Sequence, residues 1–315
     1  MYDFRPFLRD IVPRAVGDHR AGGGYRRLGD GVAEPDLYGT AAAVGIQASL
    51  GLPLDPALGD AILRFRHADG SLRDPSHGVM HNTATGFGAL ALLDREHTFP
   101  ARLSHLVQPT DIGLWLDGLD WSEAWVTSHD AAGLVAIGTM TGQSDEWLNA
   151  AFDWLDRAVD PVTGLWHREM IGRVDADPGL FGNLGCSYHF HFLYAFHGRP
   201  VPYPQQVVDT CLRIAEESDW IHASDLGYPQ LDWTHSLWRS SRQSGHRHGD
   251  VDAHLARVSE RLHAAVQADD VSALVEDLHV LAAIVALIAE LAEALPEIVT
   301  VDSDVRVITD VRPFM

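Results

Sequence analysis

The chain has 315 residues, of which 44 are acidic and 23 basic, and every basic residue is an arginine. A formal charge of −21 excludes nucleic acid and long polyanions as favoured partners, because phosphate binding needs a basic surface. The first residues lack the pattern of a secretory signal, and the longest apolar run, residues 280–289, is too short to span a membrane. We therefore expect a cytoplasmic protein without membrane contact, whose two cysteines, Cys186 and Cys211, stay reduced.

Two kinds of helix are expected to alternate along the chain. The first helix covers about residues 4–16 and ends before the glycines at 22–24. Helices rich in glycine and alanine then alternate with helices that carry an apolar stripe on one side and charges on the other. We expect the amphipathic helices over residues 56–67, 110–119, 145–159, 204–217 and 251–267. The segment 298–311 is expected to form a short strand or an extended arm.

Each small-residue helix follows a cluster of polar residues, and this arrangement recurs six times. The clusters begin at Asp36, His81, Ser128, Cys186, Asp232 and Glu276. Their spacing, roughly 44 to 58 residues, is the length of a helical hairpin with its loops, and such a period is typical of a repeat or closed array. The pattern predicts one domain over residues 1–315, a ring of six hairpins in which the small-residue helices lie inside.

This alternating order resembles the six-hairpin α/α toroid of terpenoid cyclases, protein prenyltransferase β subunits, and several glycosidase and sugar-epimerase families. The resemblance covers nearly the whole chain and is one of architecture. It implies an all-α (α/α)6 fold with about twelve helices, and a site at the end of the ring where the inner helices begin. Architecture does not fix the reaction, which has to be argued from the residues of the site.

The polar clusters supply the groups that acid–base catalysis needs at one site. We expect a hydrolase, lyase or isomerase that acts on a small carbohydrate-like molecule without a cofactor or metal ion. The expected catalytic residues are two carboxylates and two imidazoles: Asp36, Asp232, His129 and His279. The expected substrate-binding residues are Tyr38, His81, Tyr188, His189, Trp233 as a stacking platform, and Arg239 for an anionic substituent. The oligomeric state is left open.

Three alternatives remain open from the sequence. Asp232 and His279 resemble part of the zinc site of prenyltransferases, although Thr234 stands where that site has a cysteine. The many aromatic residues also suit a terpenoid cyclase, which predicts a mostly apolar cavity. A non-catalytic ring that binds a ligand is the third alternative. In addition, Asp36 and Asp232 precede or open helices, where aspartate most often serves as an N-cap.

Overall fold

The computed structural model describes residues 1–29, 34–166, 179–217, 221 and 225–314. The expectation of a predominantly helical chain is confirmed, since the strands in these ranges are only two residues long. Strands β1 (Tyr2–Asp3) and β4 (Val299–Thr300) pair in parallel, and β2 (Arg20–Ala21) pairs antiparallel with β3 (Gly24–Tyr25). Within the same ranges, no helix combines the length and the apolar character needed to cross a membrane.

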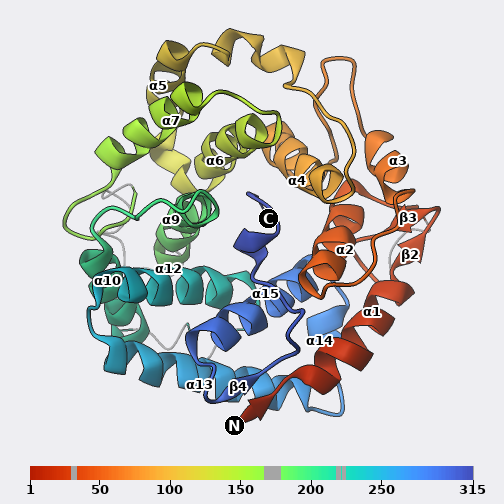
Figure 1. Ribbon diagram of the computed structural model, residues 1–315, viewed down its shortest axis with the longest axis vertical. Coiled ribbons are helices and arrows are strands. Elements are labelled where there is room, and N and C mark those ends of the chain that lie inside the picture. The colour runs from red at the N-terminus through yellow and green to blue at the C-terminus, as the bar shows by residue number, and fades with distance from the viewer. Residues whose placement is uncertain (30–33, 167–178, 218–220, 222–224, 315) are drawn as a thin grey trace.

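Six helices contact one another in a closed order that follows the sequence. These inner helices are α2 (Leu37–Ser49), α4 (Val79–Leu92), α6 (Ala124–Met140), α9 (Gly179–Phe196), α12 (Tyr228–Ser244) and α15 (Leu278–Ala294). Each packs against the next, and α15 packs against α2, so the six surround a common interior (Figure 1). Most of them begin within about one turn of a polar cluster found in the sequence, whereas α9 begins at Gly179, about two turns before Cys186.

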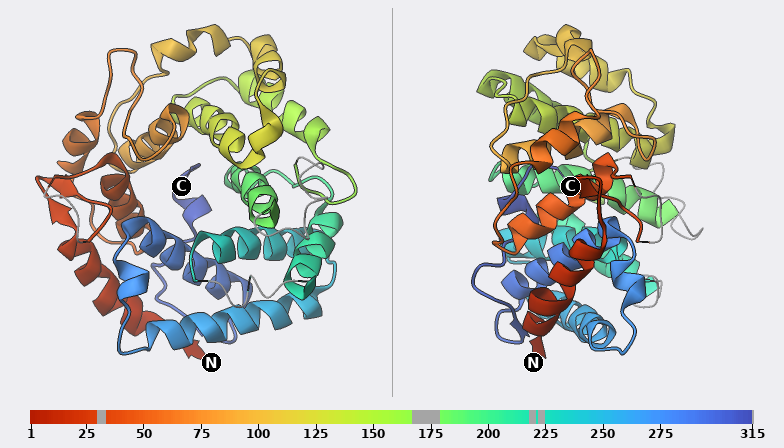
Figure 2. Two further views of the ribbon diagram at one scale, coloured as in Figure 1. Left: turned by 180° about the vertical axis from the view of Figure 1, so that it is seen from behind. Right: turned by 90° about the vertical axis from the view of Figure 1, so that its right-hand side faces the viewer.

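The remaining long helices lie outside this ring (Figures 1 and 2). They are α1 (Val12–Asp18), α3 (Leu58–Leu63), α5 (Pro109–Asp117), α7 (Asp145–Ala158), α10 (Pro204–Glu217) and α13 (His248–Val266). Shorter elements join them: η1 (Phe7–Ile11), η2 (Ala101–Leu106), η3 (Trp121–Glu123), α14 (Ser272–Val275) and η4 (Ile308–Asp310). The expected helix over 56–67 is shorter than predicted, and the first helix is split into a π-helical turn and α1.

Small residues let the inner helices pack closely on their neighbours. A Cβ atom at Gly133 of α6 would lie 3.2 Å from the carbonyl oxygen of Met80 in α4. At Gly138 it would lie 2.4 Å from the ring of Trp147, which the amphipathic helix α7 buries against α6. The glycine and alanine content that marked these helices in the sequence is therefore a packing requirement.

The short strand expected in 298–311 is found as β4, but the range ends in the helical turn η4 (Ile308–Asp310) and not in an extended arm. The segment after β4 turns into the ring, where the C-terminal end of the described chain lies in Figure 1 and in the left view of Figure 2. Arg312 and Phe314 are almost completely buried there, and Arg312 Nη1 donates a hydrogen bond of 3.4 Å to the carbonyl oxygen of Ala41 in α2. Cβ atoms at Gly45 and Gly88 would contact the Arg312 side chain, so both glycines make room for it.

Candidate functional site

Seven aromatic side chains form a continuous arc inside the ring. We call them the interior cluster; in spatial order they are Tyr228, His279, Tyr38, His77, His81, His129 and His189. The centroids of successive rings lie 4.1 to 4.9 Å apart. Every inner helix contributes one member, and His77 comes from the turn before α4. The polar openings of the six repeats thus meet at one place.

Asp232 lies on the side where this arc is open, between α9 and α12. Its Oδ2 atom is 3.5 Å from the position that a Cβ atom would take at Gly185, one helical turn before His189. The carboxyl group is buried, and Oδ1 has no hydrogen-bond partner among the described residues. A buried polar atom without a partner is costly, so its presence needs an explanation, such as a catalytic role or a bound water.

Hydrogen bonds from neighbouring helices orient three of the imidazoles. The Tyr38 hydroxyl lies 3.1 Å from His81 Nδ1 and 3.3 Å from its Nε2, and the Tyr228 hydroxyl lies 2.9 Å from His279 Nδ1. Ser128 of α6 places its hydroxyl 2.8 Å from Nδ1 of His189. A bond to one ring nitrogen fixes the ring orientation and directs the other nitrogen elsewhere. No hydrogen bond to His129 is found in the described part of the chain.

Burial keeps the interior cluster uncharged at neutral pH. Desolvation lowers the pKa of His129 to about 4 and lowers those of His81, His189 and His279 well below the usual value. The same desolvation raises the pKa of Asp232 well above its usual value. Burial thus favours the protonated form of the Asp232 carboxyl group and the neutral form of the imidazoles, and these are the forms that can give and take a proton.

Three predicted site residues take other places. Asp36 caps α2, because its two carboxylate oxygens accept hydrogen bonds of 2.5 and 2.6 Å from the backbone nitrogens of Gly39 and Arg27. Trp233 is fully buried and donates from Nε1 to the carbonyl oxygen of Cys211 on the outer helix α10, so it is a core residue and not a stacking platform. Arg239 lies far along α12 and pairs with Glu290.

The predicted residues that do come together are Tyr38, His81, His129, His189 and His279, with Asp232 beside them. Tyr188 is buried next to them, with its ring centroid 6.2 Å from that of His189 and 5.3 Å from that of His235.

Sequence reasoning missed four residues of this region: His77, Tyr228, Arg312 and Phe314. His77 lies in the turn before α4, outside the helix that holds His81, so helical spacing does not reveal that the two rings stack. Phe314 stacks at 6.2 Å against the ring of His189 and meets His81 at 5.0 Å. Nothing near residue 314 in the sequence indicates that it reaches the interior.

One group of possible metal ligands occurs among the described residues. His81, His129 and His189 each offer a ring nitrogen, and these three atoms lie within 4.8 Å of one another. The prenyltransferase-like alternative placed zinc at Asp232 and His279, and neither belongs to this group.

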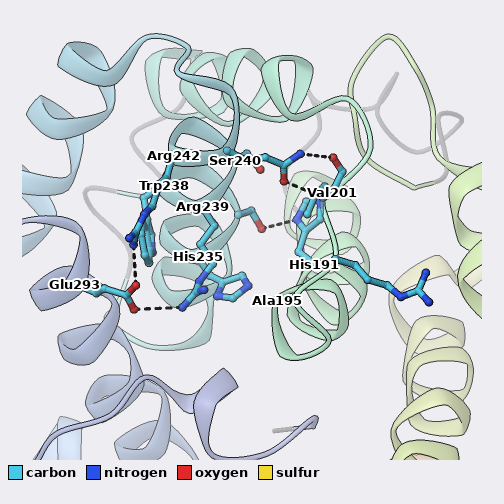
Figure 3. Close-up of a pocket in the computed structure, with 13 residues that line it drawn as sticks. His191, Ala195, Val201, His235, Trp238, Arg239, Ser240, Arg242 and Glu293 are labelled. Atoms are coloured by element: carbon cyan, nitrogen blue, oxygen red, sulfur yellow. Dashed lines mark hydrogen bonds and ion pairs between the residues drawn. The ribbon is translucent and has the colours of Figure 1, made fainter. Parts of the chain in front are cut away.

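A second polar region lies at the opposite ends of α9, α12 and α15 (Figure 3). It surrounds a pocket of about 400 Å³ lined by His191, His235, Arg239, Arg242 and Glu293, among others. Behind it, the fully buried Glu290 accepts hydrogen bonds from His235 Nδ1 at 2.7 Å, Trp238 Nε1 at 2.6 Å and Arg239 Nε at 3.3 Å. These contacts join α12 to α15.

Comparison with models of protein families, with curated proteins and with solved structures found no match to this chain. The function is therefore argued from the geometry of the interior cluster.

Proposed function

We propose that the chain is an enzyme of the (α/α)6 toroid architecture whose reaction centre is the interior cluster together with Asp232. The closed order of six inner helices and the outer position of the helices between them support the architecture. The convergence of one polar aromatic side chain from each inner helix supports the position of the site. Packing alone does not require five histidines in contact, because buried polar groups are costly unless they are paired or hydrated.

The proposed reaction is acid–base catalysis that needs no metal for proton transfer, as in a hydrolase, lyase or isomerase. The observation that carries it is the buried carboxyl group of Asp232, whose Oδ1 has no protein partner among the described residues. Asp232 is the proposed general acid. His279 is the proposed base, and its ring is held by Tyr228, which lies one turn before Asp232 on α12. His129, which lacks a hydrogen bond, is a second candidate base.

The proposed substrate is small, neutral or weakly acidic, and polar, with a carbohydrate or a carbohydrate-derived compound favoured. Imidazole, phenol and carboxyl groups can bond hydroxyl groups, and the rings of the interior cluster can stack on a sugar. A terpenoid cyclase would need a lining made mostly of tryptophan, phenylalanine and leucine. The interior cluster consists of histidine and tyrosine side chains, which disfavours that alternative.

The test is turnover of a panel of glycosides, unsaturated glycuronides and free sugars by the full chain in the presence of a chelator. For a compound that is turned over, Asp232→Asn should lower kcat/KM by about 100-fold or more, the usual contribution of a positioned acid or base. His279→Asn should show a similar loss. Asp225→Asn and His105→Asn, which change exposed residues, are the matched controls and should retain wild-type activity.

Full activity of both Asp232→Asn and His129→Ala would refute the assignment. Stoichiometric binding of a panel compound without any turnover would favour the non-catalytic ligand-binding alternative.

A further inference from the structure

We propose that His81, His129 and His189 form a binding site for one divalent transition-metal ion, such as Zn²⁺, with a further coordination position open. The proposal goes beyond the acid–base function and does not depend on Asp232 or His279, which lie outside this trio; it makes His129, the second candidate base, a metal ligand. It also goes beyond the sequence, which led us to expect no metal.

The three histidines come from consecutive inner helices, α4, α6 and α9, and His129 lies between the other two. The ring of His129 meets the rings of His81 and His189 at centroid distances of 4.4 and 4.7 Å, with interplanar angles of 70° and 71°. Their ligand nitrogens lie within 4.8 Å of one another. Around a tetrahedral zinc ion with bonds of about 2.0–2.1 Å, ligand nitrogens lie about 3.4 Å apart. The difference is at most about 1.4 Å, which small side-chain rotations that move each of two nitrogens by about 0.7 Å would close.

The hydrogen bonds around the trio are those that metal-binding histidines usually have. Such a histidine bonds one ring nitrogen to a protein group and directs the other nitrogen to the metal. Ser128 holds Nδ1 of His189 and so leaves Nε2 free. The Tyr38 hydroxyl lies within hydrogen-bond distance of both ring nitrogens of His81, at 3.1 and 3.3 Å, and can bond only one of them at a time. His129 keeps both nitrogens available, because no hydrogen bond to it is found among the described residues.

The surroundings suit a metal ion with an open position. His81 is buried, whereas His129 and His189 are each partly exposed, so solvent or a substrate can approach from their side. Neutral imidazole is the form that binds metals, and burial favours that form here. Three imidazoles without a thiolate or carboxylate suit zinc, copper, nickel and iron better than calcium or magnesium.

Such an ion has two possible uses in this position. With three protein ligands and an open position, a zinc ion acidifies a bound water or polarises a substrate oxygen. Asp232 and His279 would remain free for proton transfer, and His129 would serve as a ligand instead of a base.

The experiment measures metal binding by the full chain without any substrate. Protein freed of metal with a chelator is titrated with Zn²⁺ against a chromophoric zinc indicator, and with Co²⁺ while the visible absorption is recorded. The expected result for the wild type is one Zn²⁺ per chain and a Co²⁺ spectrum of a low-coordinate site. His129→Asn and His189→Asn should weaken Zn²⁺ binding by at least 100-fold, and Ser128→Ala by about 10- to 100-fold, as for the loss of an outer partner.

His279→Asn is the matched control, since His279 belongs to the interior cluster but not to the trio. It should bind Zn²⁺ within about threefold of the wild type. Circular dichroism establishes that each variant is folded, and His129 is the best ligand to replace because no partner loses a hydrogen bond.

Absence of stoichiometric binding to the wild type would overturn the proposal. Equal losses in His279→Asn and His129→Asn would overturn it as well, because they would indicate a general effect on the cluster. Metal binding is measured without substrate, so loss of Zn²⁺ binding in His129→Asn is a separate result from loss of turnover in Asp232→Asn.

Discussion

Replacing Glu290 by glutamine tests whether the buried contact between α12 and α15 stabilises the closed ring. The carboxylate of Glu290 is fully buried and accepts bonds from His235, Trp238 and Arg239. Glutamine has nearly the same shape, but one of its two terminal groups is a donor, so at least one of these donors loses its acceptor. The neighbouring Arg239 also loses its buried counter-charge and keeps only Glu293, at 3.6 Å.

The expected loss of stability is about 3 kcal/mol, because removing one partner of a buried ion pair costs about 3–5 kcal/mol and Arg239 keeps a second partner. For 315 residues the entropy of unfolding is about 0.66 kcal/mol per kelvin, so the melting temperature should fall by about 5 °C. Differential scanning calorimetry at pH 7 measures this change. Glu293→Gln is the matched control: its carboxylate is partly exposed and pairs with Arg242, so the loss should be about 1 kcal/mol or less.

The stability difference between the wild type and Glu290→Gln should change with pH in one direction. Burial would raise the pKa of Glu290, but the nearby His235 and Arg239 outweigh it, so the pKa is lowered. A carboxylate with a lowered pKa in the folded state stabilises the protein above its unfolded pKa, about 4.3, and loses this effect as the pH falls. The gap between wild type and Glu290→Gln should therefore shrink below about pH 4. Equal, small shifts for Glu290→Gln and Glu293→Gln at pH 7 would refute the reasoning.

Three further predictions concern stability. Burial raises the pKa of Asp232, so the folded wild type loses stability as the pH rises above about 4. Asp232→Asn should therefore melt at a higher temperature than the wild type at pH 7 but not at pH 4, and a difference in melting temperature that does not depend on pH would contradict this. Gly138→Ala should lower the free energy of unfolding in urea by about 1–3 kcal/mol, since the added Cβ atom would meet the Trp147 ring. Gly249→Ala, in open space at the start of α13, should raise it by up to about 1 kcal/mol. Phe314→Ala should cost about 3–5 kcal/mol in the same assay if the tail is a fixed part of the interior, and a loss below about 1 kcal/mol would show that it is not.

The convergence of the interior cluster could be predicted because it follows from repetition. When equivalent helices in a closed array begin with polar residues, their first turns lie at the same end. Helix geometry also predicts the direction of individual side chains. Trp233 directly follows Asp232, so it points to a different face of α12, and it packs on α10.

Other features could not be read from the sequence, for physical reasons. An aspartate that caps a helix and an aspartate that donates a proton look the same in a sequence, and only the two backbone bonds to Asp36 show that it is a cap. Similarly, Phe314 reaches His81 although 233 positions separate them, and local patterns do not indicate contacts over that distance.

The closed order of the inner helices has a consequence for how the protein folds. The contact between α2 and α15 joins segments at least 229 residues apart, from Ser49 to Leu278, and contacts of such long range form slowly. Arg312 bonds to α2, so its position is fixed only once both ends of the ring are present. The groups of the interior cluster come from residues 38 to 279, and a fragment that lacks either end of this range cannot assemble them. Such a fragment should therefore lack the proposed activity completely and should not retain part of it, because the site forms only in the whole ring.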